Sequence, residues 1–191
     1  MKVAAFNGSP RPGGNTSMLI RMVLEEIEKE GIETETFQVG GADIRGCSAC
    51  MKCKELQNRR CSVEDDGNRF IAKIQEADGI LLGSPTYFSD VTAEMKALID
   101  RAGYVSRQNG HLLRRKVGAG VVAARRAGSI HAFDTLNHFF LINEMIVPGS
   151  SYWNVAFGHD AGDVELDAEG QRTMAVLGQN MAWLLKKTQR D

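Results

Sequence analysis

The chain has 191 residues, enough for one domain with a sizeable core, and its 23 lysines and arginines against 24 acidic residues give a formal net charge of −1. Such a balance creates no positive electrostatic field that would attract nucleic acid or an anionic membrane, so we expect neither as a partner. Because no run approaches about 18 apolar residues and the N-terminus lacks a signal-peptide pattern, we expect a cytoplasmic protein.

Strand-like and helix-like segments alternate along the whole chain. Apolar runs typical of buried parallel strands lie at 3–6, 79–82, 117–123 and 145–147, with a weaker alternating candidate at 32–39. Helical patterns lie at 16–30, 69–77, 92–102, 129–144 and 167–187. This order predicts an α/β three-layer sandwich: a five-stranded parallel sheet with helices on both faces, in the flavodoxin-like order 2-1-3-4-5. We expect residues 1–191 to form this single domain, with an insertion at about 44–66.

The loop after the first strand, in FNGSPRPGGNTSMLI (6–20), has the composition of an anion site. Ligands of open parallel sheets sit beyond the carboxyl ends of the strands, and here glycines free backbone N–H groups while the next helix directs its positive end at the same point. Neither a Walker nor a G-x-G-x-x-G pattern is present, so a monophosphate is the best candidate, and an ordinary capped turn is the alternative. The side chains expected to anchor it are Ser9, Arg11, Asn15, Thr16 and Ser17.

Three segments in series resemble motifs of the NAD(P)H-dependent FMN reductase family. GSPRPGGNTS (8–17) resembles its phosphate loop, and GSPTYFSDVTAEMKALIDR (83–101) resembles the loop and helix that contact the isoalloxazine ring. The segment GAGVVAARRAGSIHAFDTLNHFFLINEMIVPGS (118–150) resembles the fourth strand, third flavin loop and following helix. The resemblance implies a flavodoxin-like fold, noncovalent FMN, NAD(P)H as co-substrate, and a homodimer or homotetramer.

The second and third loops would then hold the flavin ring. An aromatic pair after the third strand could cover a flat ring, and one arginine after the fourth could stabilise negative charge on the reduced flavin. The residues concerned are Pro85, Thr86, Tyr87, Phe88, Ala124, Arg125, Arg126 and Gly128.

All four cysteines lie in CSACMKCKELQNRRC, with the spacing C-x2-C-x2-C-x7-C at Cys47, Cys50, Cys53 and Cys61. In a reducing compartment such a cluster indicates metal or redox chemistry before disulfides. A [4Fe-4S] cluster fits the spacing, and the segment resembles the compact motif of iron-sulfur flavoproteins, a branch of the same family. Zinc and a bare set of redox-active or structural thiols are the alternatives.

These observations predict an oxidoreductase in which the flavin carries the chemistry and no side chain is catalytic. Electrons would pass from NAD(P)H, or from a ferredoxin-like donor, to a quinone, flavin or other small acceptor. The alternative is an iron-sulfur flavoprotein that carries electrons without oxidising NAD(P)H, and a third hypothesis is a metal-binding structural module. We expect a homo-oligomer because the segment SSYWNVAFGHD (150–160) looks exposed at Tyr152, Trp153 and Phe157.

Overall fold

The computed structural model describes residues 1–188. Its parallel sheet has five strands in the order β2-β1-β3-β4-β5, which confirms the predicted flavodoxin-like topology. The strands are β1 (Lys2–Asn7), β2 (Glu33–Gln38), β3 (Gly79–Pro85), β4 (Val117–Ala124) and β5 (Val155–Phe157). The helices are α1 (Asn15–Lys29), α2 (Lys52–Leu56), α3 (Gly67–Glu76), α4 (Ala93–Gln108), α5 (Ser129–Ile142) and α6 (Ala168–Thr188), with a short 3-10 turn at Asp163–Glu165.

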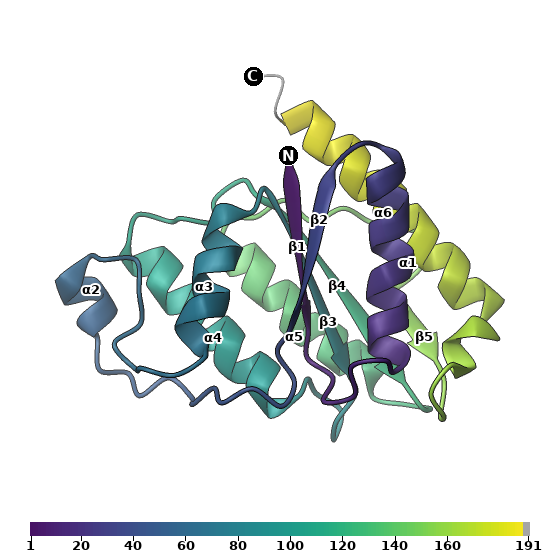
Figure 1. Cartoon of the computed structure of the whole chain (residues 1–191), viewed down its shortest axis with the longest axis horizontal. Helices are drawn as coiled ribbons and strands as arrows, with labels where there is room; N and C mark the ends of the chain where they lie inside the picture. The colour runs from purple at the N-terminus through teal and green to yellow at the C-terminus, as the bar shows by residue number, and fades with distance from the viewer. Residues whose placement is uncertain (189–191) are drawn as a thin grey trace.

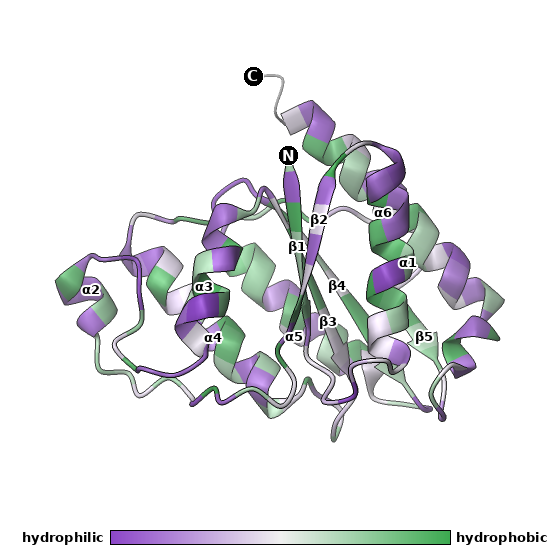
Figure 2. Ribbon diagram, in the orientation of Figure 1, coloured by the Kyte–Doolittle hydropathy of each residue, from purple (hydrophilic) through white to green (hydrophobic). Residues whose placement is uncertain are grey.

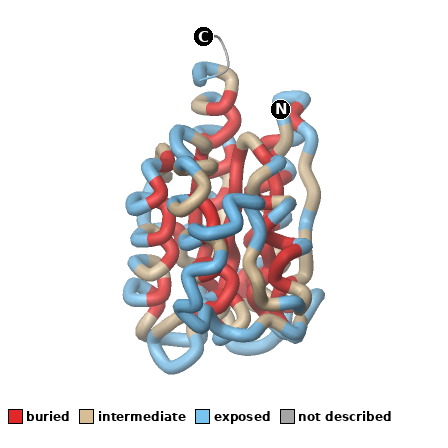
Figure 3. Tube along the Cα trace, turned by 90° about the vertical axis from the view of Figure 1, so that its left-hand side faces the viewer, coloured by how far each residue is buried: buried red, intermediate tan, exposed pale blue. Residues whose placement is uncertain are grey.

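Helices cover both faces of the sheet. α1 and α6 lie side by side on one face, and α3, α4 and α5 cover the other (Figure 1). Residues of β1 alternate between the two resulting cores: Val3 and Ala5 pack with α1 and α6, whereas Ala4 and Phe6 pack with the other three helices. Because both faces are covered, the central strands are largely apolar (Figure 2) and lie buried between the helical layers (Figure 3).

The fifth strand lies elsewhere than predicted, so the expected strand at 145–147 is wrong. Ile146 forms only an isolated bridge with Val117. Pro148 then lacks the N–H that a further ladder bond requires, and the chain leaves the sheet. Buried Asn154 brings it back by donating from Nδ2 to a carbonyl of β4 at 3.0 Å, and β5 follows directly. A strand of three residues is too short to give a recognisable apolar pattern.

Two helices differ from the sequence prediction. α4 continues to Gln108, whereas the pattern ended at Ala102, because burial of Val105 outweighs the cost of about 1 kcal/mol that Gly103 brings to a helix interior. The short α2 was not predicted. Among residues 1–188, no helix combines the length and the apolar character that crossing a bilayer requires.

The cysteine-containing segment between β2 and α3 runs outside the sheet, with α2 at the edge of the molecule near α4 (Figure 1). Polar side chains of the helical layer hold it there. Asn109, after the end of α4, donates from Nδ2 to the carbonyl of Cys53 at 3.1 Å, and buried Asn68 of α3 donates to the carbonyl of Cys61 at 3.0 Å. The segment is therefore attached to the domain by side chains far from it in sequence.

Candidate functional site

A hollow of about 160 Å³ lies where β1, β3 and β4 end. Nine of the thirteen predicted cofactor residues line it: Ser9, Arg11, Asn15, Thr16, Pro85, Thr86, Tyr87, Ala124 and Arg125. The topology explains this meeting, because the carboxyl ends of parallel strands share one edge of the sheet. Ser17, Phe88, Arg126 and Gly128 do not line the hollow, so their contact with a cofactor stays a prediction.

The helix α1 presents an uncapped N-terminus to this hollow. Gly14 precedes the helix in an extended conformation, and no side chain caps the first turn. The first backbone N–H groups of a helix have no intrahelical acceptor, so those of Asn15, Thr16 and Ser17 are available to a ligand. Together with the positive end of the helix dipole, they offer donors that suit an anion, and binding of an anion here stays a prediction.

Hydrogen bonds from neighbouring elements fix the loop before α1. The N–H of Gly8 donates to the carbonyl of Gly83 at 2.8 Å, and the hydroxyl of Thr92 donates to the carbonyl of Gly8 at 2.8 Å. Gly40 approaches the same loop so closely that a Cβ there would lie 2.3 Å from the carbonyl oxygen of Ser9. The loop therefore has its shape before any ligand binds.

Asn15 has a structural role that the sequence did not reveal. Its Nδ2 donates to the carbonyl of Asp160 at 2.9 Å, and its Oδ1 accepts from the N–H of Gly162 at 2.9 Å. Its amide group is thus engaged with the segment after β5 rather than free for an anion. That segment contributes Gly158, His159 and Ala161 to the hollow, three lining residues that the sequence analysis missed because it misplaced β5.

The turn after β3 projects an aromatic side chain into solvent at the rim of the hollow. Tyr87 and Asp90 exchange two backbone hydrogen bonds, of 2.8 and 3.0 Å. Between them, Phe88 (φ 48°) and Ser89 (φ 65°) both adopt the left-handed region, an uncommon and strained conformation for residues other than glycine. Phe88 is fully exposed (107%), and its contact with a cofactor stays a prediction.

The four cysteines line a second, smaller hollow of about 20 Å³ beside α4. All four are free thiols, and Arg101, Tyr104 and Val105 of α4 also line the hollow. In the described part of the chain, no three His, Cys, Asp or Glu side chains are grouped closely enough to hold one metal ion. The thiols are instead distributed around a common space.

The thiols differ in their ionisation. A hydrogen bond with Ser62, assisted by the backbone N–H of Lys52, lowers the pKa of exposed Cys50 to about 7. Burial raises the pKa of Cys53, and the neighbouring Cys61 and Cys47 add to that effect. Cys50 and Cys53 therefore differ in how readily each forms the thiolate that a metal or an oxidant would meet.

The residues present fit FMN and an iron-sulfur cluster in different ways. The strand-end hollow offers helix N–H donors and the exposed cation of Arg11 to a phosphate, but its volume is below the roughly 300 Å³ at which pockets enclose drug-sized ligands. It would enclose part of FMN and leave the remainder at the rim. The thiol hollow offers four sulfur ligands and faces a buried guanidinium, which suits an anionic group, although about 20 Å³ requires the thiols to part around it.

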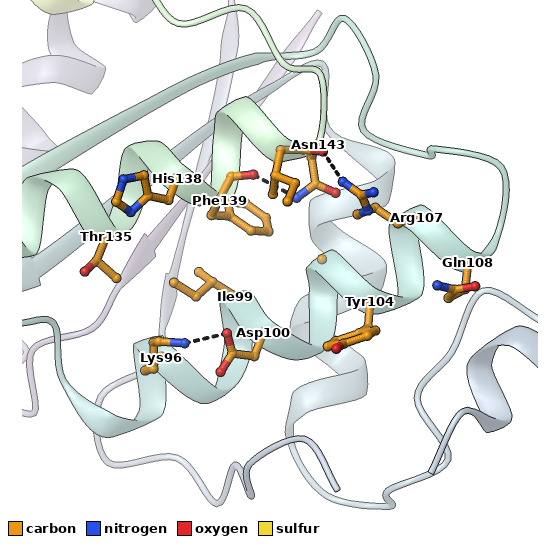
Figure 4. Close-up of a pocket in the computed structure, with 12 residues that line it drawn as sticks. Lys96, Ile99, Asp100, Tyr104, Arg107, Gln108, Thr135, His138, Phe139 and Asn143 are labelled. Atoms are coloured by element: carbon orange, nitrogen blue, oxygen red, sulfur yellow. Dashed lines mark hydrogen bonds and ion pairs between the residues drawn. The ribbon is translucent and has the colours of Figure 1, made fainter. Parts of the chain in front are cut away.

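Another hollow, of about 620 Å³, lies between α4 and α5 (Figure 4). Lys96 pairs with Asp100 at its edge at 2.5 Å, and Arg107 donates to the carbonyl of Ile142 at the end of α5. Figure 4 marks both interactions. Its walls are helix faces, and none of the predicted flavin residues or cysteines lines it. It is therefore a groove of the helical layer rather than a site at the strand ends.

Comparison with known proteins agrees with this geometry. The sequence pattern of the NADPH-dependent FMN reductase family matches residues 1–160. An iron-sulfur flavoprotein of Methanocaldococcus jannaschii is 39% identical over 193 aligned residues, which cover 97% of this chain and 98% of that protein. An iron-sulfur flavoprotein of Methanosarcina thermophila is 30% identical over 199 aligned residues, which cover 100% and 98%.

Solved structures share the fold at low sequence identity. RosB with bound 8-demethyl-8-formylriboflavin-5′-phosphate superposes with a TM-score of 0.76 at 21% identity, covering 100% of this chain and 81% of RosB. A flavodoxin, the WrbA-like protein of Agrobacterium tumefaciens, superposes with a TM-score of 0.66 at 14% identity, covering 97% of both chains. From the family match and the two sequence relatives, the chain belongs to the NADPH-dependent FMN reductase family, in its iron-sulfur flavoprotein branch.

Proposed function

We propose that this protein is an FMN-dependent oxidoreductase that takes electrons from NAD(P)H, or from a ferredoxin-like donor, and passes them to a quinone, flavin or other small acceptor. The observation that carries the proposal is the strand-end hollow with its uncapped helix terminus, in a chain of the FMN reductase family. When bound there, FMN would supply the transfer of a hydride or of single electrons.

The residues of the hollow would bind and orient the cofactor. Thr16, with the first N–H groups of α1, would hold the phosphate, and Arg11 would add a charge from the solvent side. Asn15 would keep the segment after β5 closed against the hollow. Tyr87 and Phe88 would cover the ring at the rim, and Arg125 lies where it would favour a negatively charged flavin.

We further propose that Cys47, Cys50, Cys53 and Cys61 hold a [4Fe-4S] cluster. Support comes from their shared hollow, from the buried cation that faces it, and from the names of the relatives, which are iron-sulfur flavoproteins. A cluster exchanges one electron at a time. It would connect a one-electron donor with the two-electron chemistry of a flavin.

A second candidate is an electron carrier that does not oxidise NAD(P)H. It is favoured by the exposure of Cys47 and Cys50, which would let a protein donor such as a ferredoxin approach the cluster edge directly. The two candidate functions differ in the reductant of the flavin: NAD(P)H would reduce it in the reductase, and a protein such as ferredoxin would reduce it in the carrier.

One anaerobic experiment separates them. Protein purified without oxygen is assayed for flavin, iron and sulfide, and then mixed with NADPH, NADH or reduced ferredoxin while the flavin absorbance is followed. Rapid bleaching by a pyridine nucleotide supports the reductase, and bleaching by ferredoxin alone supports the carrier. Protein that binds no FMN when the cofactor is added in excess contradicts both.

We also propose a homodimer or homotetramer. Tyr152 and Trp153, in the excursion before β5, are exposed and lie against each other and Phe133. Exposed aromatic groups of this kind are typical of interfaces between subunits. A neighbouring copy would also cover the part of FMN that the small hollow leaves at the rim.

A further inference from the structure

Arg101 of α4 is a buried cation with one unused hydrogen-bond donor. Its side chain is 0% exposed, and it lines the thiol hollow together with the four cysteines. Its Nε has no hydrogen-bond partner within the described residues. Burying a charged donor without an acceptor is unfavourable, so an Nε in this position indicates an acceptor that belongs in the hollow.

Both Nη atoms of Arg101 donate to acceptors of the surrounding segment, which limits rotation of the guanidinium. Nη1 donates to both carboxylate oxygens of Asp65, at 2.7 and 2.8 Å, and to the carbonyl of Arg45 at 3.1 Å. Nη2 donates to the carbonyl of Val63 at 3.0 Å. Gly67 packs against the guanidinium plane, where an added Cβ would lie 2.8 Å from Cζ. The guanidinium of Arg101, which lines the thiol hollow, therefore cannot rotate without breaking these contacts.

Arg101 stays positively charged in its buried position, because an arginine guanidinium is not deprotonated in proteins and the carboxylate of Asp65 lies beside it. Cys61 lines the same hollow as Arg101, but its sulfur is not a hydrogen-bond partner of Nε. Its sulfur instead accepts the N–H of Val63 at 3.5 Å.

We propose that Arg101 donates its Nε–H to a sulfur of the iron-sulfur cluster and so raises the reduction potential of that cluster. The inference rests on the proposed function, because it requires the cluster to be present. Reduction adds one negative charge, and a hydrogen bond from a cation stabilises the more negative state more strongly. Asp65 holds the guanidinium and offsets part of its long-range field, so the directed Nε contact dominates the effect.

The reduction potential tests this role independently of enzyme activity. The full chain, purified anaerobically, is titrated with dithionite in the presence of mediators while the cluster is followed by electron paramagnetic resonance. Arg101→Lys keeps the charge and loses the Nε–H, and we expect its reduction equilibrium to shift at least tenfold toward the oxidised cluster, a potential about 59 mV lower. The double variant Arg101→Gln with Asp65→Asn, which leaves no buried carboxylate unpaired, should shift in the same direction.

Arg107→Lys is the matched control, because Arg107 lies on the same helix and donates to the end of α5 instead. Its potential should stay within twofold of the wild-type equilibrium, about 18 mV. Arg101 variants that bind the cluster and stay within the same limit would overturn the inference. Wild-type protein that contains no iron and sulfide would contradict the proposed function before Arg101 is tested.

A measurement on the wild-type chain covers the case in which the Arg101 variants do not fold. Protein labelled with ¹⁵N-arginine is reduced, and hyperfine coupling between the cluster and nitrogen is recorded by pulsed electron paramagnetic resonance. We expect coupling to an arginine nitrogen, unchanged in labelled Arg107→Lys. A reduced cluster without such coupling would refute the hydrogen bond.

Discussion

Removing the hydroxyl group of Thr16 should weaken FMN binding while leaving the fold intact. Thr16 is 2% exposed and lines the strand-end hollow in the first turn of α1. Its methyl group packs next to Gly83, where an added Cβ would lie 3.1 Å from it. Thr16→Val therefore removes the donor and keeps the shape, whereas Thr16→Ser keeps the donor and removes the methyl group.

The magnitude follows from the charge of the proposed partner. A hydrogen bond to a charged group contributes about 1.5 to 3 kcal/mol, so Thr16→Val should raise the Kd for FMN by about 10- to 150-fold. Thr16→Ser should stay within about threefold of the wild type, because a lost methyl contact at this position costs well under 1 kcal/mol of binding when the phosphate is the ligand. Ser17→Ala is the matched control, because Ser17 lies in the same turn of α1 but does not line the hollow.

Titration of the flavin-free protein with FMN, followed by quenching of flavin fluorescence, gives the four values of Kd. Urea unfolding of each variant shows whether the fold is retained. The reasoning is refuted if Thr16→Val binds FMN as the wild type does, or if Ser17→Ala weakens binding as much as Thr16→Val.

Three further outcomes are expected. Gly40→Ala should lower the free energy of unfolding by about 1 to 3 kcal/mol and weaken FMN binding, because its Cβ would meet the backbone of Ser9. Gly149→Ala has open space around it and should change neither quantity. Urea unfolding and FMN titration measure the two effects. Burial tends to raise the pKa of Asp65, but hydrogen bonds from a backbone N–H and from the buried guanidinium outweigh burial and hold this pKa below 3.8. The ionised carboxylate therefore stabilises the fold above about pH 4, and this stabilisation is lost as the pH falls through the lower pKa of the folded state. The difference in unfolding free energy between wild type and Asp65→Asn should accordingly shrink below about pH 4. Trp153→Ser should shift the protein toward the monomer in light scattering, and an unchanged assembly would exclude this aromatic surface as the interface.

The strand-end hollow could be predicted because its position depends only on the order of the strands and of the loops that follow them along the chain. Once the strands at the start of the chain and at 79–82 and 117–123 are recognised, the parallel topology brings the loops after them to one edge. The residues after β5 were missed for a related reason. Their strand is short and is held by the side chain of Asn154, which no apolar pattern reveals.

The thiol hollow could be predicted only in part. The spacing of the cysteines brought them together as candidates, but their position depends on Asn68 and Asn109, whose side chains reach the segment from other elements. The role of Arg101 was also invisible, because an arginine in an amphipathic helix is usually a solvated charge. Its burial depends on Asp65, which precedes it by 36 residues.

The helix α4 links the two candidate sites mechanically. Thr92, at its N-terminus, donates to the carbonyl of Gly8 in the loop that faces the strand-end hollow. Arg101 in its middle faces the thiols, and Asn109 just after its end holds the carbonyl of Cys53. At 1.5 Å per residue, Thr92 and Arg101 lie about 13 Å apart along the axis, so one rigid helix sets the spacing between the two hollows. A shift of α4 would therefore disturb both sites together, whereas substitutions at Thr16 or at a cysteine should disturb only one.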